Sequence, residues 1–460
     1  MENNRLMQKA EVNRPLSHRQ VWMLAGPIML SNISVPLVGA VDTAVVGRLP
    51  DPAAIGAVAL GALIFSILYW GFGFLRMGTT GFIARAVGAG DQQQLLDTLL
   101  RVLFVAAGMG VCIILLGVPI VQFALFLLEG SAQVEALTRD YAMIRIWSAP
   151  ATLSIYVFTG VFIGMHNTWY AFVLQLILNI TNVVLDLIFV LVLDMGVEGV
   201  AIATLISEYL AACCGFYLLR SQIWRAIQLI DINRLLDRIA LKQLFQANSD
   251  IFIRTLGVTF AFAYFTAESA RLGEVILAAN AILMHLQSIM AYALDGFAHA
   301  AEALTGSAYG ASKRQEFKRA VLLTSYWAAI LAFIITLVYW VFGSAILSLF
   351  TDIESVLQNS NAYLTWLIIL PLLSIWSFQL DGIFIGSGFT REMRNAMVVS
   401  VVLYLILLTV LVPWLGNHGL FLGLCLFMVL RAVTLAFYYP RILSSFKSRS
   451  LTASHSHDRL

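Results

Sequence analysis

Twelve long apolar stretches separated by short polar segments are the strongest constraint on how this chain can fold. Each stretch exceeds the length of about 20 residues that an α-helix needs to cross a bilayer. Their apolar character is nearly continuous, without the alternation that marks a membrane β-barrel. The sequence therefore predicts an all-α membrane protein with twelve transmembrane helices. The predicted spans are residues 21–47, 53–82, 95–118, 141–165, 168–193, 197–219, 248–272, 275–308, 317–345, 360–386, 393–414 and 418–440.

The charged residues agree with a membrane protein and predict its orientation. The 460 residues are 60% hydrophobic and 12% charged, whereas a soluble domain has about 45–50% and about 25%. Most of the 28 Lys and Arg residues fall in the two tails, 1–20 and 441–460, and in the connections on the same side. This count places Arg254 in an inner connection and Arg145 in an outer one. By the positive-inside rule, both tails are cytoplasmic. The basic residues form no single patch, so we expect no nucleic-acid partner.

The two halves of the chain are repeats of each other. The segment GVFIG at 160–164 matches GIFIG at 382–386, and Gly88 matches Gly310 at the same shift of 222 residues. Each half has six spans, so the halves share one orientation and form parallel repeats. We expect an N-lobe over 21–219 and a C-lobe over 248–440 around a central cleft. Between the two lobes, residues 220–247 are predicted to be an amphipathic linker on the inner membrane face.

Two carboxylates lie at matching depth in the first lobe. Each costs about 2.5–3.5 kcal/mol to insert, so each needs a function or a partner. At a rise of 1.5 Å per residue, Asp42, Asp186 and Thr204 lie about 9–12 Å from the outer ends of their spans. Asn182 stands one turn from Asp186 on the same helix face. Such an oxygen-only set suits a shared proton or Na⁺, and the sequence does not choose between them. The alternative for Asn182 and Asp186 is a hydrogen-bonded contact between helices. Neither carboxylate has an acidic counterpart at the 222-residue shift.

Other charged groups within the spans allow more than one interpretation. Asp295 and Asp381 lie toward the inner ends of spans 8 and 10, where they could hold an inward gate, attract a cationic substrate or be structural. Glu268 is interpreted first as a helix-end salt bridge with the basic residue three positions later. Arg76 and Glu208 either pair with each other or extend toward the membrane surface.

Two prolines, Pro27 and Pro36, fall in the first span together with Asp42. Each removes a backbone hydrogen bond, so the span can bend there. Bending would link the protonation or ion occupancy of Asp42 to the shape of the cavity. A static kink is the alternative.

The sequence resembles the multidrug and toxic compound extrusion (MATE) transporters, specifically their DinF-like branch, from about residue 17 to 445. The segments that carry the resemblance are PIMLSNISVPLVGAVDTAVVGRL, NITNVVLDLIFV, YALDGFAHAAEALTGSAYGA and LDGIFIG. It implies a monomeric antiporter of the bacterial inner membrane that needs no cofactor. This antiporter would export lipophilic, often cationic, compounds in exchange for H⁺ or Na⁺ by alternating access of the two lobes.

The resemblance also assigns residues. It implies that Asp42, Asn182, Asp186 and Thr204 form a proton or Na⁺ site in the first lobe and that the first span bends at Pro27. The NorM-like branch instead places its cation site on acids in spans 7 and 10. Glu268 and Asp381 stand in those spans.

Two other functions were weighed against an antiporter. A flippase for a lipid-linked precursor has a similar architecture but needs a strongly basic cavity for phosphate, and only Arg76 and Arg431 were counted within the spans. A membrane enzyme or receptor is the other alternative. An enzyme needs a cluster of His, metal ligands or a nucleophile, whereas the span histidines His285 and His299 are isolated. We therefore expect a transporter, not an enzyme.

Overall fold

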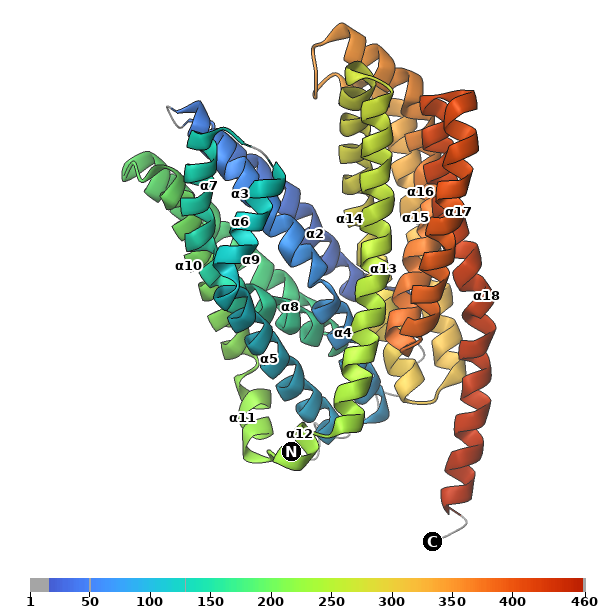
Figure 1. Cartoon of the computed structure of the whole chain (residues 1–460). Helices are drawn as coiled ribbons and strands as arrows, with labels where there is room; N and C mark the ends of the chain where they lie inside the picture. The colour runs from blue at the N-terminus through green and yellow to red at the C-terminus, as the bar shows by residue number, and fades with distance from the viewer. Residues whose placement is uncertain (1–15, 49–50, 129, 458–460) are drawn as a thin grey trace.

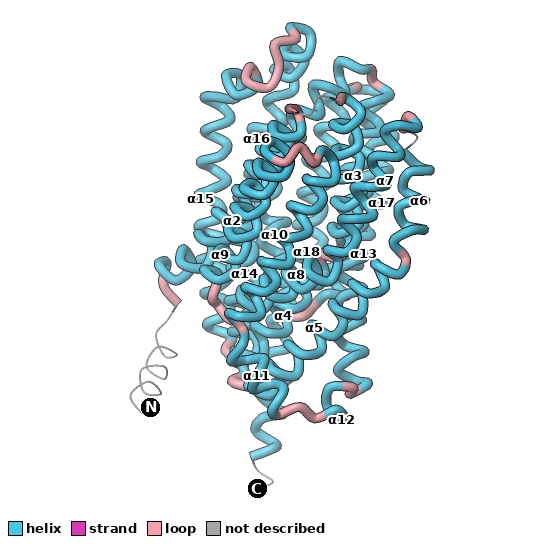
Figure 2. Tube along the Cα trace, turned by 90° about the vertical axis from the view of Figure 1, so that its left-hand side faces the viewer, coloured by secondary structure: helices cyan, strands magenta, loops and turns pink. Residues whose placement is uncertain are grey.

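The computed structural model describes residues 16–48, 51–128 and 130–457, with the backbone alone for 35–43 and 448–457. The described residues form helices joined by short loops and contain no strand (Figure 2). The N-terminal half contains α2 (His18–Val46), α3 (Pro52–Gly71), α4 (Phe74–Ala89), α5 (Gln92–Leu115), α6 (Gly117–Leu128), α7 (Ala132–Arg145), η1 (Ile146–Ser148), α8 (Ala149–Gly164), α9 (Thr168–Asp186), η2 (Leu187–Val192) and α10 (Gly196–Leu218). After it come α11 (Arg220–Gln228), α12 (Ile232–Leu235), α13 (Arg238–Arg271), α14 (Glu274–Gly310), α15 (Arg314–Leu347), α16 (Glu354–Ser387), α17 (Thr390–Leu415) and α18 (Asn417–His457).

The helices confirm the predicted all-α membrane fold. In the described part of the chain, 11 helical segments are long and apolar enough to cross a membrane. They match predicted spans 2 to 12, while α2, with 29 residues, occupies the first. Some spans are built from two helices, because α3 and α4 together form span 2, and α7 and α8 together form span 4.

The linker differs from a single amphipathic helix. Two aspartates divide it, because the Asp231 carboxylate accepts a hydrogen bond from the Asn233 N–H and the Asp237 carboxylate accepts one from the Ile239 N–H. Aspartate is a strong N-cap, so each starts a new helix. As a result α13 begins at Arg238, ten residues before the predicted start of span 7.

The helices are arranged as two bundles, α2–α10 and α13–α18 (Figure 1). We call the end that holds α11, α12 and the C-terminal part of α18 the linker end. The bundles approach each other near this end and diverge toward the opposite end. The two predicted lobes therefore form separate bundles.

The repeated glycine motifs make the same contact in both lobes. A Cβ on Gly160 would lie 2.5 Å from the carbonyl oxygen of Arg76, and a Cβ on Gly382 would lie less than 3.0 Å from that of Ala298. Ala298 is the residue that the 222-residue shift pairs with Arg76. In each lobe, a glycine thus brings two helix backbones together, as is common between membrane helices.

At the linker end, α4 and α14 cross in a reciprocal contact. Gly88 of α4 packs against the carbonyl of Ser307, while Gly310 of α14 packs against the carbonyl of Arg85. The 222-residue shift relates Arg85 to Ser307 and Gly88 to Gly310, so each side presents the same surface. Such a self-complementary contact is the mark of a two-fold axis. A Cβ at either glycine would lie under 3.0 Å from the facing backbone.

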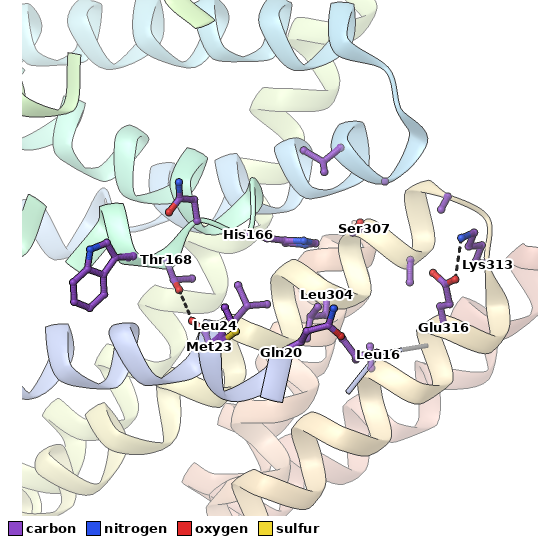
Figure 3. A pocket seen from close by; sticks show the side chains of 17 residues that line it. Leu16, Gln20, Met23, Leu24, His166, Thr168, Leu304, Ser307, Lys313 and Glu316 are labelled. Carbon is purple, nitrogen blue, oxygen red and sulfur yellow. Dashed lines mark hydrogen bonds and ion pairs between the residues drawn. The ribbon is translucent and has the colours of Figure 1, made fainter. Parts of the chain in front are cut away.

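Two polar contacts between the lobes add to this closure. Arg85 donates a hydrogen bond to the Gly386 carbonyl at 2.9 Å, and His166 Nε2 lies 3.1 Å from the Ala303 carbonyl. Burial lowers the pKa of His166, which favours the neutral ring that donates to this carbonyl. Beside them lies a cavity of about 560 Å³, lined by the starts of α2 and α9, the α8–α9 turn, the end of α4 and the α14–α15 connection (Figure 3).

We predict that Gly88→Ala opens the linker end. The added methyl group overpacks the crossing at a cost of about 1–3 kcal/mol, so the closed arrangement should lose about tenfold in population relative to an open one. Spin labels on the exposed positions Gln92 and Gln315 would report the separation of the lobes by pulsed electron paramagnetic resonance. Gly108→Ala is the matched control, because nothing lies within 4 Å of its added Cβ. Identical distance distributions for both variants would contradict the prediction.

Candidate functional site

The helices α2 and α9 run side by side in register. Thr168 Oγ1 donates to the Met23 carbonyl at 3.2 Å (Figure 3), and Asn179 Nδ2 donates to Ser34 Oγ at 2.8 Å. Both pairs are separated by 145 residues, so the two helices run parallel without slipping. Position 42 of α2 is therefore level with residues 186–187 of α9.

The structure brings three of the four residues of the predicted cation site close to one another. Asn182 Nδ2 donates to Thr204 Oγ1 at 3.3 Å, which links α9 to α10. Asp186 is 1% exposed and ends α9 where the π-helix η2 begins. Such π-helical turns occur frequently at functional sites. Asp42 lies in α2 at the same level, and its side chain is outside the described residues, as is that of Pro36.

These groups offer a set of oxygen donors from carboxylate, amide and hydroxyl groups, which suits a proton or a hard monovalent cation. The described residues contain no group of three or more His, Cys, Asp or Glu side chains that could hold a metal ion. The donor chemistry therefore fits the predicted H⁺ or Na⁺ better than a transition metal.

A buried ion pair lies beside this set. Arg145 Nη2 is 3.1 Å from Glu208 Oε1, and Thr152 donates to the second oxygen of the same carboxylate. Glu208 stands one turn from Thr204 on α10. The Arg145 side chain is 15% exposed, so its assignment to an outer connection was wrong.

Arg76 pairs across the two lobes. Its Nη1 lies 3.9 Å from Glu302 Oε2 on α14, and Glu302 is 1% exposed. Neither sequence interpretation of Arg76 and Glu208 is correct, because each has a different partner. Glu302 was missed as an acid within a span. Its spacing of seven residues from Asp295 places the two on one helix face and could have revealed it.

The acids of the C-lobe have different surroundings. Asp381, 4% exposed, accepts hydrogen bonds from both Arg254 and Arg431 through the same oxygen, the latter at 2.7 Å. Arg254 therefore lies within a span, and its assignment to an inner connection was wrong. Glu268 pairs with Arg271 at 2.7 Å, as expected for a helix-end salt bridge. Since two guanidinium groups already neutralise Asp381, this geometry does not fit a second cation site.

A cavity of about 640 Å³ lies between the lobes. Its walls come from α3 and α4 of the N-lobe and from α13, α14, α16 and α18 of the C-lobe. Asp295 lines it and forms no ion pair with any described residue. The charged, aromatic and methionine residues of the lining are Arg254, Asp295, His299, Arg431, Trp70, Phe262, Tyr292, Phe378, Met77, Met284 and Met428.

The MatE family model matches residues 27–188 and again residues 251–411, once in each lobe. The chain belongs to the MATE family. This MATE protein is 40% identical to the DNA damage-inducible protein F of Escherichia coli over 92% of each chain, which confirms the DinF-like branch. It is 22% identical to the probable multidrug resistance protein NorM of Idiomarina loihiensis, over 95% of this chain and 96% of that protein.

The fold also matches solved structures. The outward-facing conformation of a multidrug resistance MATE family transporter of the MOP superfamily superposes with a TM-score of 0.85 at 20% identity, covering 94% of this chain and 97% of that chain. The family consists of transporters, so this chain is a transporter and not an enzyme.

We predict strong coupling between Arg145 and Glu208 in this MATE protein. Removing one partner leaves the other charge buried, so Glu208→Gln should lower the free energy of unfolding by about 3–5 kcal/mol. The double variant with Arg145→Gln should lose less than the sum of the single variants. Unfolding in mixed micelles measures these differences. Glu268→Gln is the control, because its partner Arg271 is 73% exposed and such pairs contribute about 0–1 kcal/mol. Additive losses would contradict the coupling.

Proposed function

We propose that this MATE protein is a secondary active antiporter that exports lipophilic, often cationic, compounds in exchange for H⁺ or Na⁺. The main support is the buried Asp186, which lies beside the Asn182–Thr204 pair and level with Asp42. Intramembrane carboxylates of this kind mark proton or ion pathways. The NorM relative is named as a multidrug resistance protein, and the large cavity with aromatic and methionine walls suits varied lipophilic ligands.

The orientation follows from charge. We place the linker end in the cytoplasm of a bacterium and the protein in the inner membrane as a monomer, with both termini inside. The basic linker and the C-terminal part of α18 both lie at this end. Since the lobes are in contact there through α4 and α14, the described state is the outward-facing one. Export then requires the crossing at Gly88 and Gly310 to separate.

The helix α2 is the element through which ion binding would act. It pairs with α9 along the N-lobe, yet it also contacts α14 of the C-lobe. Asn32 Nδ2 donates to the Tyr292 carbonyl at 3.1 Å, and Met29 packs against Gly296. Binding of a cation near Asp42 would change the hydrogen bonding of α2, and Pro27 supplies a point at which the helix can bend. Such a bend moves the contacts with α14, and Tyr292 and Asp295 of that helix line the cavity.

The cavity does not favour a flippase for lipid-linked phosphates. Three arginines lie near it, one more than the sequence count found. Each has an acidic partner, because Arg254 and Arg431 share Asp381 and Arg76 pairs with Glu302. A strongly basic surface for a phosphate is therefore not present among the described residues.

We predict that Asp42→Asn and Asp186→Asn each lower ion-driven efflux at least tenfold, because a neutral amide cannot take up the proton or balance Na⁺. Efflux of a fluorescent cation from proteoliposomes is measured under an imposed H⁺ gradient alone and under an imposed Na⁺ gradient alone. The arm that drives efflux in the wild type identifies the coupling ion.

The control for these variants is Asp352→Asn, which changes an exposed carboxylate in the α15–α16 loop. Equal amounts of reconstituted protein exclude an effect on folding. Wild-type efflux by Asp42→Asn would refute the mechanism, and a lack of response to either gradient would refute the antiport.

A further inference from the structure

Two arginines on the C-lobe wall of the cavity share a single carboxylate oxygen. Arg254 of α13 and Arg431 of α18 both donate to Oδ2 of Asp381. A guanidinium group carries five N–H donors. Besides Asp381, the contacts of these two groups in the described structure are limited to the sulfur of Met428, which Arg431 contacts at 3.2 Å. The Nε of each arginine is buried without an acceptor among the described residues. The pair therefore has more positive charge and more donors than Asp381 satisfies.

Both arginines line the cavity, so a bound molecule can reach their guanidinium groups. Buried donors without acceptors are costly, at about 1–3 kcal/mol each. An ionised carboxylate would satisfy several of them at once, because guanidinium and carboxylate match in geometry and charge. This wall is thus suited to an anionic group.

A carboxylate stands on another wall of the same cavity. Asp295 of α14 lines it and pairs with no basic side chain of the described residues. Aromatic rings of Trp70, Phe262 and Tyr292 also line the cavity and provide surface for a flat apolar body. The cavity therefore offers a positive wall, a negative wall and aromatic surface in one space.

We propose that this cavity binds zwitterionic amphiphiles, whose carboxylate pairs with Arg254 and Arg431 and whose cationic group pairs with Asp295. The inference rests on the proposed export function and specifies its substrate class. A monocation with the same body satisfies Asp295 but leaves the excess donors unmet. A monoanion satisfies the donors and meets the unpaired Asp295 with like charge. The zwitterion alone complements both walls.

Two xanthene dyes form a matched pair of probes. Rhodamine 110 is zwitterionic at neutral pH, and rhodamine 123 is its methyl ester and carries only the positive charge. Equilibrium binding to the purified full-length protein in detergent, followed by fluorescence anisotropy, should show about tenfold tighter binding of rhodamine 110. Equal affinity for the two dyes, or tighter binding of the ester, would overturn the proposal.

Variants then locate each charge. Arg254→Gln should weaken rhodamine 110 about tenfold and leave rhodamine 123 within about twofold, while Arg431 still holds Asp381. Arg254→Lys, which keeps the charge, should recover part of the loss. Asp295→Asn should weaken both dyes. Arg271→Gln, on the same helix but exposed at its opposite end, is the control. An equal loss of both dyes in Arg254→Gln would show a structural role alone and would refute the carboxylate subsite.

The binding assay separates this inference from the antiport mechanism. If rhodamine 123 is exported under an ion gradient but the two dyes bind equally, the substrate class is wrong and the antiport stands. If rhodamine 110 binds preferentially but neither dye moves under any gradient, the antiport is wrong and the binding site stands.

Discussion

The close approach of two helix backbones at the crossing of α4 and α14 determines the shape of the rest of the molecule. Gly88 and Gly310 allow the contact because neither carries a Cβ that would strike the facing carbonyl. In a bilayer, helices gain little from burying apolar surface against each other, so van der Waals contact between backbones is a main source of association. The contact lies at one end of the molecule and holds the lobes together there. The lobes diverge toward the other end, and the cavity lies between them.

A duplicated scaffold carries charges that are not duplicated. In the N-lobe, Asp186 lies with Asn182 and Thr204, which are neutral oxygen donors. In the C-lobe, Asp381 is held by two guanidinium groups. A carboxylate among neutral donors can bind and release a cation, because its charge is not already compensated. A carboxylate between two arginines is fixed in the ionised form and positions them instead. The same backbone thus supports ion coupling in one lobe and ligand recognition in the other.

The sequence predicted the features that depend on a local pattern. Span lengths follow from runs of apolar residues, and the repeat follows from glycines at a constant shift. The depth of Asp186 and Thr204 could be counted along a helix because the rise per residue is fixed. Partners of charged residues could not be predicted in this way. Arg145 and Arg254 were assigned to connections because most arginines lie there, whereas burial with Glu208 and Asp381 depends on contacts between distant spans.

The linker shows a different limit. Its apolar residues recur with helical spacing, and that periodicity favours one continuous helix. The capping aspartates Asp231 and Asp237 divide it, because a side-chain acceptor next to a free backbone N–H starts a new helix at small cost. Such caps are visible in the sequence, so giving them more weight than the periodicity would have predicted the early start of α13.

The position of α2 shows how the two lobes can be coupled without a long chain of contacts. It belongs to the N-lobe by sequence, and its register with α9 places position 42 beside Asp186. It also contacts α14, through Asn32 and Met29. A ligand shifts an equilibrium only by its differential affinity for the two states. An ion bound between α2 and α9 acts on a helix that also contacts the cavity-lining helix of the other lobe. Because α2 contacts both lobes, a change in its shape alters the ion site and the substrate cavity in a single step.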